Sequence, residues 1–154
     1  MKKILVFSDT HDYTDPCIRI IEKEKPHAII HAGDCTRDAE DISYIFPDIP
    51  VHFVKGNNDF FTTAPEHMTV IIDGVRIYVT HGHEHRVKYD SDYRTLISDA
   101  SKANPDLIIF GHTHIPCTEY KSVTVLNPGS TRFSGTYAVV ETDNGKFTTK
   151  IVEI

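Results

Sequence analysis

Short apolar runs rich in β-branched residues recur along the chain, and stretches with helical character separate several of them. The runs cover residues 4–7, 28–30, 51–54, 75–79 and 107–110. Runs of this length, bounded by polar residues, are typical of buried strands. Helix-like stretches near residues 15–25 and 38–46 separate the first three runs, and another near residues 90–103 precedes the fifth. This alternation predicts right-handed parallel crossovers, with helices covering a sheet.

Two hairpin signals lie in the more β-rich remainder of the chain. Asp73-Gly74 follows the run 69–72, and Asp143-Asn144-Gly145 separates the runs 137–141 and 147–152. Such steps between strand-like runs favour tight β-turns. The chain has no internal repeat, low-complexity tract or linker rich in Pro, Gly and Ser. We therefore expect residues 1–154 to form a single α/β domain, a mixed two-sheet β-sandwich flanked by helices.

Composition restricts both the class of protein and the class of partner. No apolar run approaches the roughly 20 residues needed to span a bilayer, and residues 4–7 are too few for the apolar part of a signal peptide. Cys17, Cys35 and Cys117 show no paired spacing, so free thiols and a cytoplasmic location are expected. The net charge of −6 argues against an extended nucleic-acid-binding surface, which needs clustered Lys and Arg. We expect no membrane partner.

Polar side chains able to bind metal follow each central apolar run within a few residues. They are Asp9, His11, Asp34, Asn57, Asn58, Asp59, His81, His83, His85, His112 and His114. Because the carboxyl ends of neighbouring strands converge on one crevice in open α/β sheets, we expect these side chains to meet. Gathering them is costly unless a cation or a hydrogen-bonding ligand compensates. Oxygen and imidazole donors without thiolate suit Mn, Fe, Zn, Co or Ni.

Five motifs occur in a fixed order along the chain. They are Asp9-x-His11, Gly33-Asp34, Gly56-Asn57-x-Asp59, His81-Gly82-His83 and Gly111-His112-x-His114, and Asn127-Pro128-Gly129-Ser130 follows them. This series resembles the calcineurin-like metallophosphoesterases, most closely their small single-domain phosphodiesterase branch. The resemblance implies an αββα, metallo-dependent phosphatase-like fold and two divalent metal ions. Manganese is the expected metal, with nickel, iron, zinc and cobalt as alternatives.

The resemblance also implies a role for each motif residue. One metal would be held by Asp9, His11, Asp34 and His114, and the second by Asp34, Asn57, His81 and His112, with the Asp34 carboxylate bridging both. Asp59 would act in catalysis by orienting a neighbour through hydrogen bonds, and its alternative role is a helix or turn cap. Many members carry His after the motif Asn, where this chain has Asn58. An amide can donate a hydrogen bond but cannot deliver a proton, which disfavours monoesters and poor leaving groups.

Asn58 and Asp59 are the expected catalytic residues, and three side chains are predicted to contact substrate: Asn58, His83 and Arg132. Arg132 follows the Asn127-Pro128-Gly129-Ser130 segment and could bind phosphate oxygens bidentately. For His83 and Arg132 the alternative is a solvated surface position. The remaining histidines, His27, His31, His52 and His67, are assigned to structure.

The predicted function is hydrolysis of a small-molecule phosphodiester. A metal-bridging hydroxide at a dinuclear site can attack phosphorus in line, because metal binding lowers the pKa of water from about 15.7 to about 7. The chain has neither G-x-S-x-G nor G-x-x-x-x-G-K-[ST], which argues against a serine nucleophile and against nucleotide-dependent phosphotransfer. The alternative function is a metal-binding scaffold for protein–protein interaction, with weak or no catalysis. The oligomeric state is left open, a homo-oligomer included.

Overall fold

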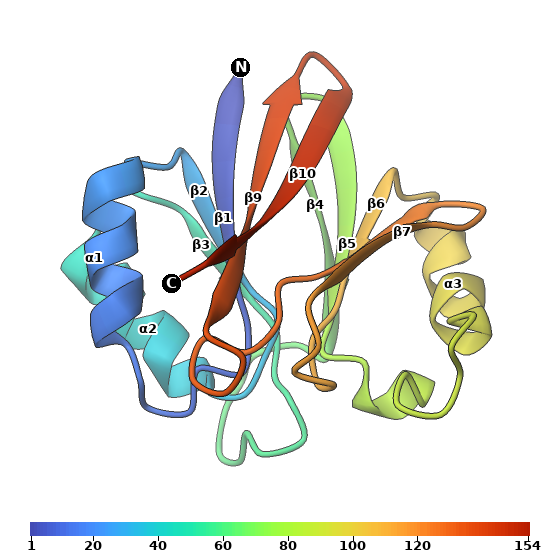
Figure 1. Ribbon diagram of the computed structural model, residues 1–154, viewed down its shortest axis with the longest axis horizontal. Coiled ribbons are helices and arrows are strands. Elements are labelled where there is room, and N and C mark those ends of the chain that lie inside the picture. The colour runs from blue at the N-terminus through green and yellow to red at the C-terminus, as the bar shows by residue number, and fades with distance from the viewer.

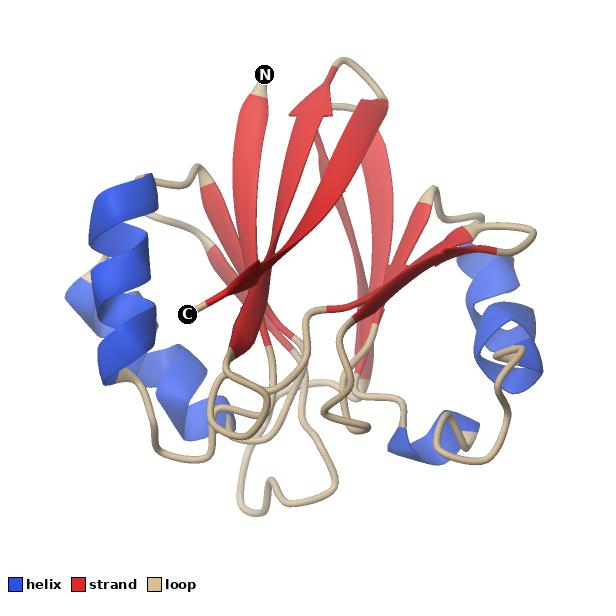
Figure 2. Cartoon of the chain, in the orientation of Figure 1, coloured by secondary structure: helices blue, strands red, loops and turns tan.

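The computed structural model describes residues 1–154 and contains two five-stranded β-sheets, with helices on their outer sides (Figures 1 and 2). The first sheet has the order β10-β9-β1-β2-β3. Its strands are β1 (Lys2–Phe7), β2 (Ala28–His31), β3 (Val51–Phe53), β9 (Thr136–Asp143) and β10 (Lys146–Glu153). Strands β1, β2 and β3 are parallel, as the predicted crossovers require, whereas β9 runs antiparallel to both β1 and β10.

The second sheet has the order β4-β5-β6-β8-β7. Its strands are β4 (His67–Ile72), β5 (Val75–Thr80), β6 (Leu107–Ile109), β7 (Cys117–Tyr120) and β8 (Thr124–Asn127). Strands β5, β6 and β8 are parallel, and the two predicted hairpins are present as β4–β5 and β9–β10. The β7–β8 hairpin was not predicted, because β7 is only half-buried and β8 has just 4 residues.

Helices cover the outer face of each sheet. Figure 1 shows α1 (Asp15–Glu24) and α2 (Thr36–Ile45) beside the first sheet and α3 (Arg94–Ala100) beside the second. The third predicted helix starts later than residue 90, because the Asp90 carboxylate accepts a hydrogen bond from the Arg94 backbone N–H at 2.9 Å and Tyr93 has a left-handed φ of 55°. Short 3-10 turns are formed by η1 (His83–His85) and η2 (Ser101–Ala103). No helix has the length and apolar character needed to cross a membrane.

The core consists of three apolar layers that follow from strand alternation. Ile4 and Val6 of β1 belong to the cluster between the two sheets, whereas Leu5 and Phe7 belong to the cluster beneath α1 and α2. A third cluster joins the second sheet to α3 through residues such as Leu96. Each fully buried side chain of this kind contributes about 1.5–3 kcal/mol of transfer free energy. The layers hold both sheets rigidly, and the loops at their common edge are placed accordingly.

The loops that follow β1, β2, β3, β5 and β6 gather at one edge of the sandwich, at the bottom of Figures 1 and 2. Each of these loops carries one of the five motifs, and the β8–β9 loop lies at the same edge. The polar residues therefore converge as predicted, and each of the two sheets supplies some of the loops that carry them.

Candidate metal centre

The carboxylate of Asp9 lies at the centre of the site, in the loop after β1. Asp9 is fully buried, and its Oδ1 lies 3.2 Å from His114 Nε2, 3.8 Å from His81 Nε2 and 3.9 Å from His11 Nε2. Oδ1 accepts no hydrogen bond, whereas Oδ2 accepts one from Ser8 Oγ and one from the His112 backbone N–H. Burial raises the pKa of Asp9, and the neighbouring His81 only partly opposes this effect. A cation beside Oδ1 would compensate the buried charge.

The second carboxylate, Asp34, faces the same imidazole of His81. Its Oδ2 lies 3.6 Å from His81 Nε2. The backbone N–H of Asn58 donates to Asp34 Oδ1 at 3.0 Å, and the Asn58 amide Nδ2 donates to Oδ2 at 2.8 Å. Burial alone would raise the pKa of Asp34, but His81 and these two hydrogen bonds lower it below its usual value. Asp34 is therefore ionised and held in place near pH 7.

Two groups of candidate ligand atoms result from this arrangement. The ligand atoms of Asp9, His11 and His114 lie within 4.8 Å of one another, and so do those of Asp9, Asp34 and His81. Asp9 belongs to both groups, whereas the resemblance gave the bridging role to Asp34. The structure thus brings these five predicted ligands together.

The ring of His81 is held so that Nε2 faces the site. Its Nδ1 lies 2.8 Å from the Ala32 carbonyl oxygen, which can only accept a hydrogen bond, so Nδ1 carries the proton. Its Nε2 lies 3.1 Å from Asn57 Oδ1. In the neutral ring, which is the form that binds metal, both of these atoms are acceptors, and the pair fits a shared cation.

His112 lies at the edge of the cluster. Its ring centroid is 5.1 Å from that of His81 and 6.2 Å from that of His83, and it belongs to neither close group of ligand atoms. Burial, together with the smaller effect of the neighbouring His81, lowers the pKa of His112 to about 4. The imidazole is therefore neutral near pH 7, which is the form that binds metal.

The Asp59 carboxylate accepts hydrogen bonds from three backbone N–H groups. Its Oδ2 accepts from Asp34 at 3.0 Å and Gly56 at 2.7 Å, and its Oδ1 accepts from Thr36 at 2.9 Å. Thr36 is the first residue of α2. One carboxylate thus binds the first N–H of α2 and the backbone of Asp34, and these contacts are compatible with either role considered for Asp59.

The three predicted substrate contacts lie around this cluster. The Asn58 side chain is bound to Asp34, and the ring of His83 lies 5.5 Å from that of His81. Arg132 is exposed, and its Nη1 donates to the His11 carbonyl at 3.0 Å. The guanidinium therefore lies at the rim of the site on the His11 side.

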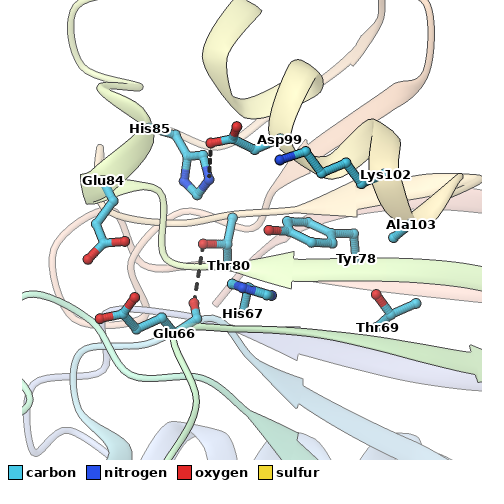
Figure 3. Close-up of a pocket in the computed structure, with 10 residues that line it drawn as sticks. All are labelled: Glu66, His67, Thr69, Tyr78, Thr80, Glu84, His85, Asp99, Lys102 and Ala103. Atoms are coloured by element: carbon cyan, nitrogen blue, oxygen red, sulfur yellow. Dashed lines mark hydrogen bonds and ion pairs between the residues drawn. The ribbon is translucent and has the colours of Figure 1, made fainter.

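His85 points away from the ligand cluster, into a neighbouring cavity of about 500 Å³ (Figure 3). The cavity is lined by Glu66, His67, Thr69, Tyr78, Thr80, Glu84, His85, Asp99, Lys102 and Ala103. Figure 3 shows the His85 ring directed toward Thr80 and His67, and its Nε2 lies 3.3 Å from Asp99. No predicted metal ligand lines this cavity. His85 therefore plays no part in the ligand cluster.

Many ligand residues have a backbone conformation that sequence reasoning did not find. Positive φ angles occur at Asp9 (53°), His11 (45°), Asp34 (44°), His112 (71°) and His114 (62°). Residues other than Gly rarely adopt this region, and Asp and His are among those enriched in it. Such strained backbone gathers at functional sites. In the sequence, the only sign of these positive φ angles was that the residues are Asp and His.

Two motif glycines are required by close packing. At Gly56 an added Cβ would overlap Asp34 Oδ1 and lie 2.8 Å from Asp34 Cγ, and at Gly111 it would overlap Ser8 Oγ and lie 2.8 Å from Asp9 Oδ2. Neither glycine has a positive φ. The glycines therefore leave room for the two carboxylates rather than permit an unusual turn.

The segment 127–133, which starts at the last residue of β8 and continues into the loop before β9, joins two loops that carry candidate ligands. Asn127 Nδ2 donates to the Gly111 carbonyl at 3.2 Å, and Ser130 Oγ donates to the Asp9 carbonyl at 2.7 Å. The Thr131 backbone N–H donates to the Ser8 carbonyl at 3.3 Å. The sequence drew attention to residues 127–130 without a role, and these contacts supply one.

Relatives of known sequence carry the same family description. A probable metallophosphoesterase of Mycoplasma pneumoniae is 33% identical over 136 residues, which cover 84% of this chain and 79% of that protein. A phosphodiesterase of Methanocaldococcus jannaschii is 27% identical over 148 residues, covering 82% of each protein.

Solved structures share the fold. A predicted phosphoesterase of Streptococcus pneumoniae has a TM-score of 0.80 and 26% identity, over 99% of this chain and 89% of that one. Zinc-bound Vps29 of Entamoeba histolytica has a TM-score of 0.75 and 20% identity, over 97% of this chain and 98% of that one. These similarities confirm the two-sheet αββα architecture expected from the sequence. The calcineurin-like phosphoesterase superfamily domain matches residues 1–145, and the chain therefore belongs to this superfamily.

Proposed function

We propose that the protein is a phosphodiesterase whose active site holds two divalent metal ions, with manganese as the expected metal. The observation that carries this proposal is the buried Asp9 Oδ1, which faces three imidazole nitrogens and accepts no hydrogen bond. A structural cluster would satisfy such an atom with a donor, because an unpaired buried carboxylate oxygen is costly. A site built for cations leaves it free.

Each half of the cluster would hold one ion. Asp9, His11 and His114 would hold the first, together with Asp34. The second would be held by Asp34, Asn57, His81 and His112. Bound divalent ions supply a hydroxide nucleophile at neutral pH and neutralise charge that develops on the phosphoryl oxygens.

The chain's own residues keep this cluster ready for ligands. Ala32 holds the His81 ring with Nε2 toward the site, and Asp59 fixes the backbone of Asp34. Asn58 donates two hydrogen bonds to the Asp34 carboxylate and so keeps it ionised. Arg132, beside His11, and His83, beside His81, would contact the phosphate oxygens from the two sides of the cluster.

A diester is favoured over a monoester for two reasons. The Asn58 side chain donates to Asp34 and, being an amide, cannot protonate a leaving group. Esters with good leaving groups are therefore the expected substrates. The relative from M. jannaschii is itself named a phosphodiesterase.

The test compares a chromogenic phosphodiester with the matching monoester, using chelator-stripped protein with Mn, Ni, Zn or no metal. Metal-dependent diester cleavage with little monoester cleavage supports the proposal. Asp34→Asn and His81→Ala should each lower turnover by at least about 10²-fold while thermal unfolding stays cooperative. Near-normal turnover in either variant contradicts the assignment of two metals. If the wild-type protein hydrolyses neither ester with any metal, the scaffold alternative is favoured.

A further inference from the structure

The histidines of the candidate metal centre are held in two different ways. His81 donates its second ring nitrogen to the Ala32 carbonyl at 2.8 Å. A bond of this kind fixes the orientation of metal-binding imidazoles in most proteins. His11 and His114 face Asp9 through Nε2, yet no protein acceptor receives a hydrogen bond from either ring. Their orientation needs another cause.

Phe133 packs against both of these rings. Its ring centroid lies 5.0 Å from that of His114 with an interplanar angle of 17°, a stacked arrangement. It lies 5.1 Å from the His11 centroid at 59°. The two imidazoles themselves meet edge to face at 5.8 Å and 76°. Aromatic pairs at such separations contribute about 0.5–1.5 kcal/mol beyond burial of area.

Hydrogen bonds to the loop of Asp9 and His11 fix the position of Phe133. Its backbone N–H donates to Ser130 Oγ at 2.9 Å, and Ser130 Oγ donates to the Asp9 carbonyl at 2.7 Å. The preceding residue, Arg132, donates to the His11 carbonyl at 3.0 Å. Phe133 is therefore anchored, through Ser130 and Arg132, to the backbone of Asp9 and His11, and its ring touches the His11 side chain.

Phe133 contributes little to the hydrophobic core. It is 60% exposed and belongs to none of the three core clusters. Packing of the hydrophobic core therefore does not explain a large apolar side chain in this position. Its ring contacts His11 and His114, and the Arg132 guanidinium lies 5.9 Å from its centroid.

We propose that Phe133 is a positioning residue, which fixes the rings of His11 and His114 by aromatic packing and thereby sets the affinity of one metal subsite. The inference rests on the proposed metal centre. It assigns Phe133 to the subsite of Asp9, His11 and His114 and gives it no direct role at the subsite of Asp34 and His81. Loss of its ring should therefore affect the two ions unequally.

The experiment titrates Mn²⁺ into chelator-stripped wild-type protein and into Phe133→Ala by calorimetry. We expect one binding step to weaken about tenfold, the lower end of the effect of removing a group that orients a metal ligand. The other step should change less than about threefold. Because Phe133 is largely exposed, the unfolding temperature should change little. Phe133→Tyr keeps the ring and should restore the affinity.

The control is Phe61→Ala, the same chemical change at a fully exposed phenylalanine. It should leave both binding steps unchanged. Proton NMR of the metal-free protein gives a second readout: Phe133→Ala should shift the ring signals of His11 and His114 but not those of His81. Equal affinities in wild type and Phe133→Ala, or equal weakening of both steps, would overturn this inference. Absence of Mn²⁺ binding to the wild type would instead overturn the proposed function.

Discussion

Replacing Gly56 by Ala should move the Asp34 carboxylate without breaking the fold. The new Cβ would lie 2.8 Å from both Asp34 Cγ and the Asp34 backbone N, and would overlap Oδ1. Since carbon atoms pack best at about 3.5 Å or more, Cγ must move by at least about 0.7 Å, and the overlapping Oδ1 must move further. The hydrogen bond from the Asn58 N–H to Oδ1, now 3.0 Å long, would be disturbed.

These contacts give the size of the effect. Overpacking costs about 1–3 kcal/mol and the disturbed hydrogen bond about 1 kcal/mol. A total of about 3 kcal/mol lowers the unfolding temperature by about 6–12 °C for a chain of this length. Misplacing a reacting group by about 1 Å can lower the rate about 10²-fold. We expect a loss of that order in kcat/KM for the diester, together with weaker Mn²⁺ binding.

Gly145→Ala is the matched control. Gly145 has a φ of +90°, and the nearest atom to its added Cβ would be the Gly74 carbonyl oxygen at 3.9 Å. Backbone strain of about 1–2 kcal/mol would lower stability, but the β9–β10 turn lies at the opposite end of the sheets from the ligand loops (Figure 1). Gly145→Ala should therefore keep metal affinity. If Gly56→Ala also keeps its metal affinity and turnover, the position of Asp34 does not limit the reaction and the reasoning is refuted.

Two further predictions concern Asp59 and His31, which are not themselves candidate metal ligands. Asp59→Asn places an amide N–H₂ donor opposite at least one of the three backbone N–H groups that the carboxylate now accepts from. The free energy of unfolding should therefore fall by about 1.5–3 kcal/mol, and Mn²⁺ affinity should fall about tenfold. An unchanged Mn²⁺ affinity in titration would mean that Asp59 is only a helix cap. Burial lowers the pKa of His31 from 6.5 to about 4. The unfolded chain therefore binds a proton that the folded protein does not, and stability, complete above pH 6.5, should decline by about 3 kcal/mol as the pH falls to about 4. Urea unfolding at several pH values checks this, and an equally steep decline in His31→Gln would exclude His31 as its source.

The sequence predicted the central strands well because their residues are buried on both faces. Ile4 and Leu5 point to different apolar layers, and a continuous apolar run is the consequence. Assignment of strands to two sheets was beyond reach, since β1 pairs with β9 across most of the chain. The β7–β8 hairpin is short and partly exposed, so its periodicity is weak.

Within the site, residue types were predictable and supporting contacts were not. Asp9 and His114 stood at recognisable places after apolar runs. Phe133 carried no such mark, because its role depends on a ring stacked at 5.0 Å by a loop distant in sequence. Asp59 was predictable as a supporting residue only through the family resemblance, because two of its three N–H partners, Asp34 and Thr36, lie in a segment distant in sequence.

The left-handed backbone of Asp9, His11, Asp34, His112 and His114 has a consequence for protein engineering. Each such residue costs up to about 1–2 kcal/mol relative to a right-handed conformation, a penalty that glycine does not bear. Exchanging a ligand for glycine thus removes donor atoms and relieves strain at once. The loops that carry the candidate ligands therefore contain costly backbone conformations, and selection for thermal stability alone should replace these residues first.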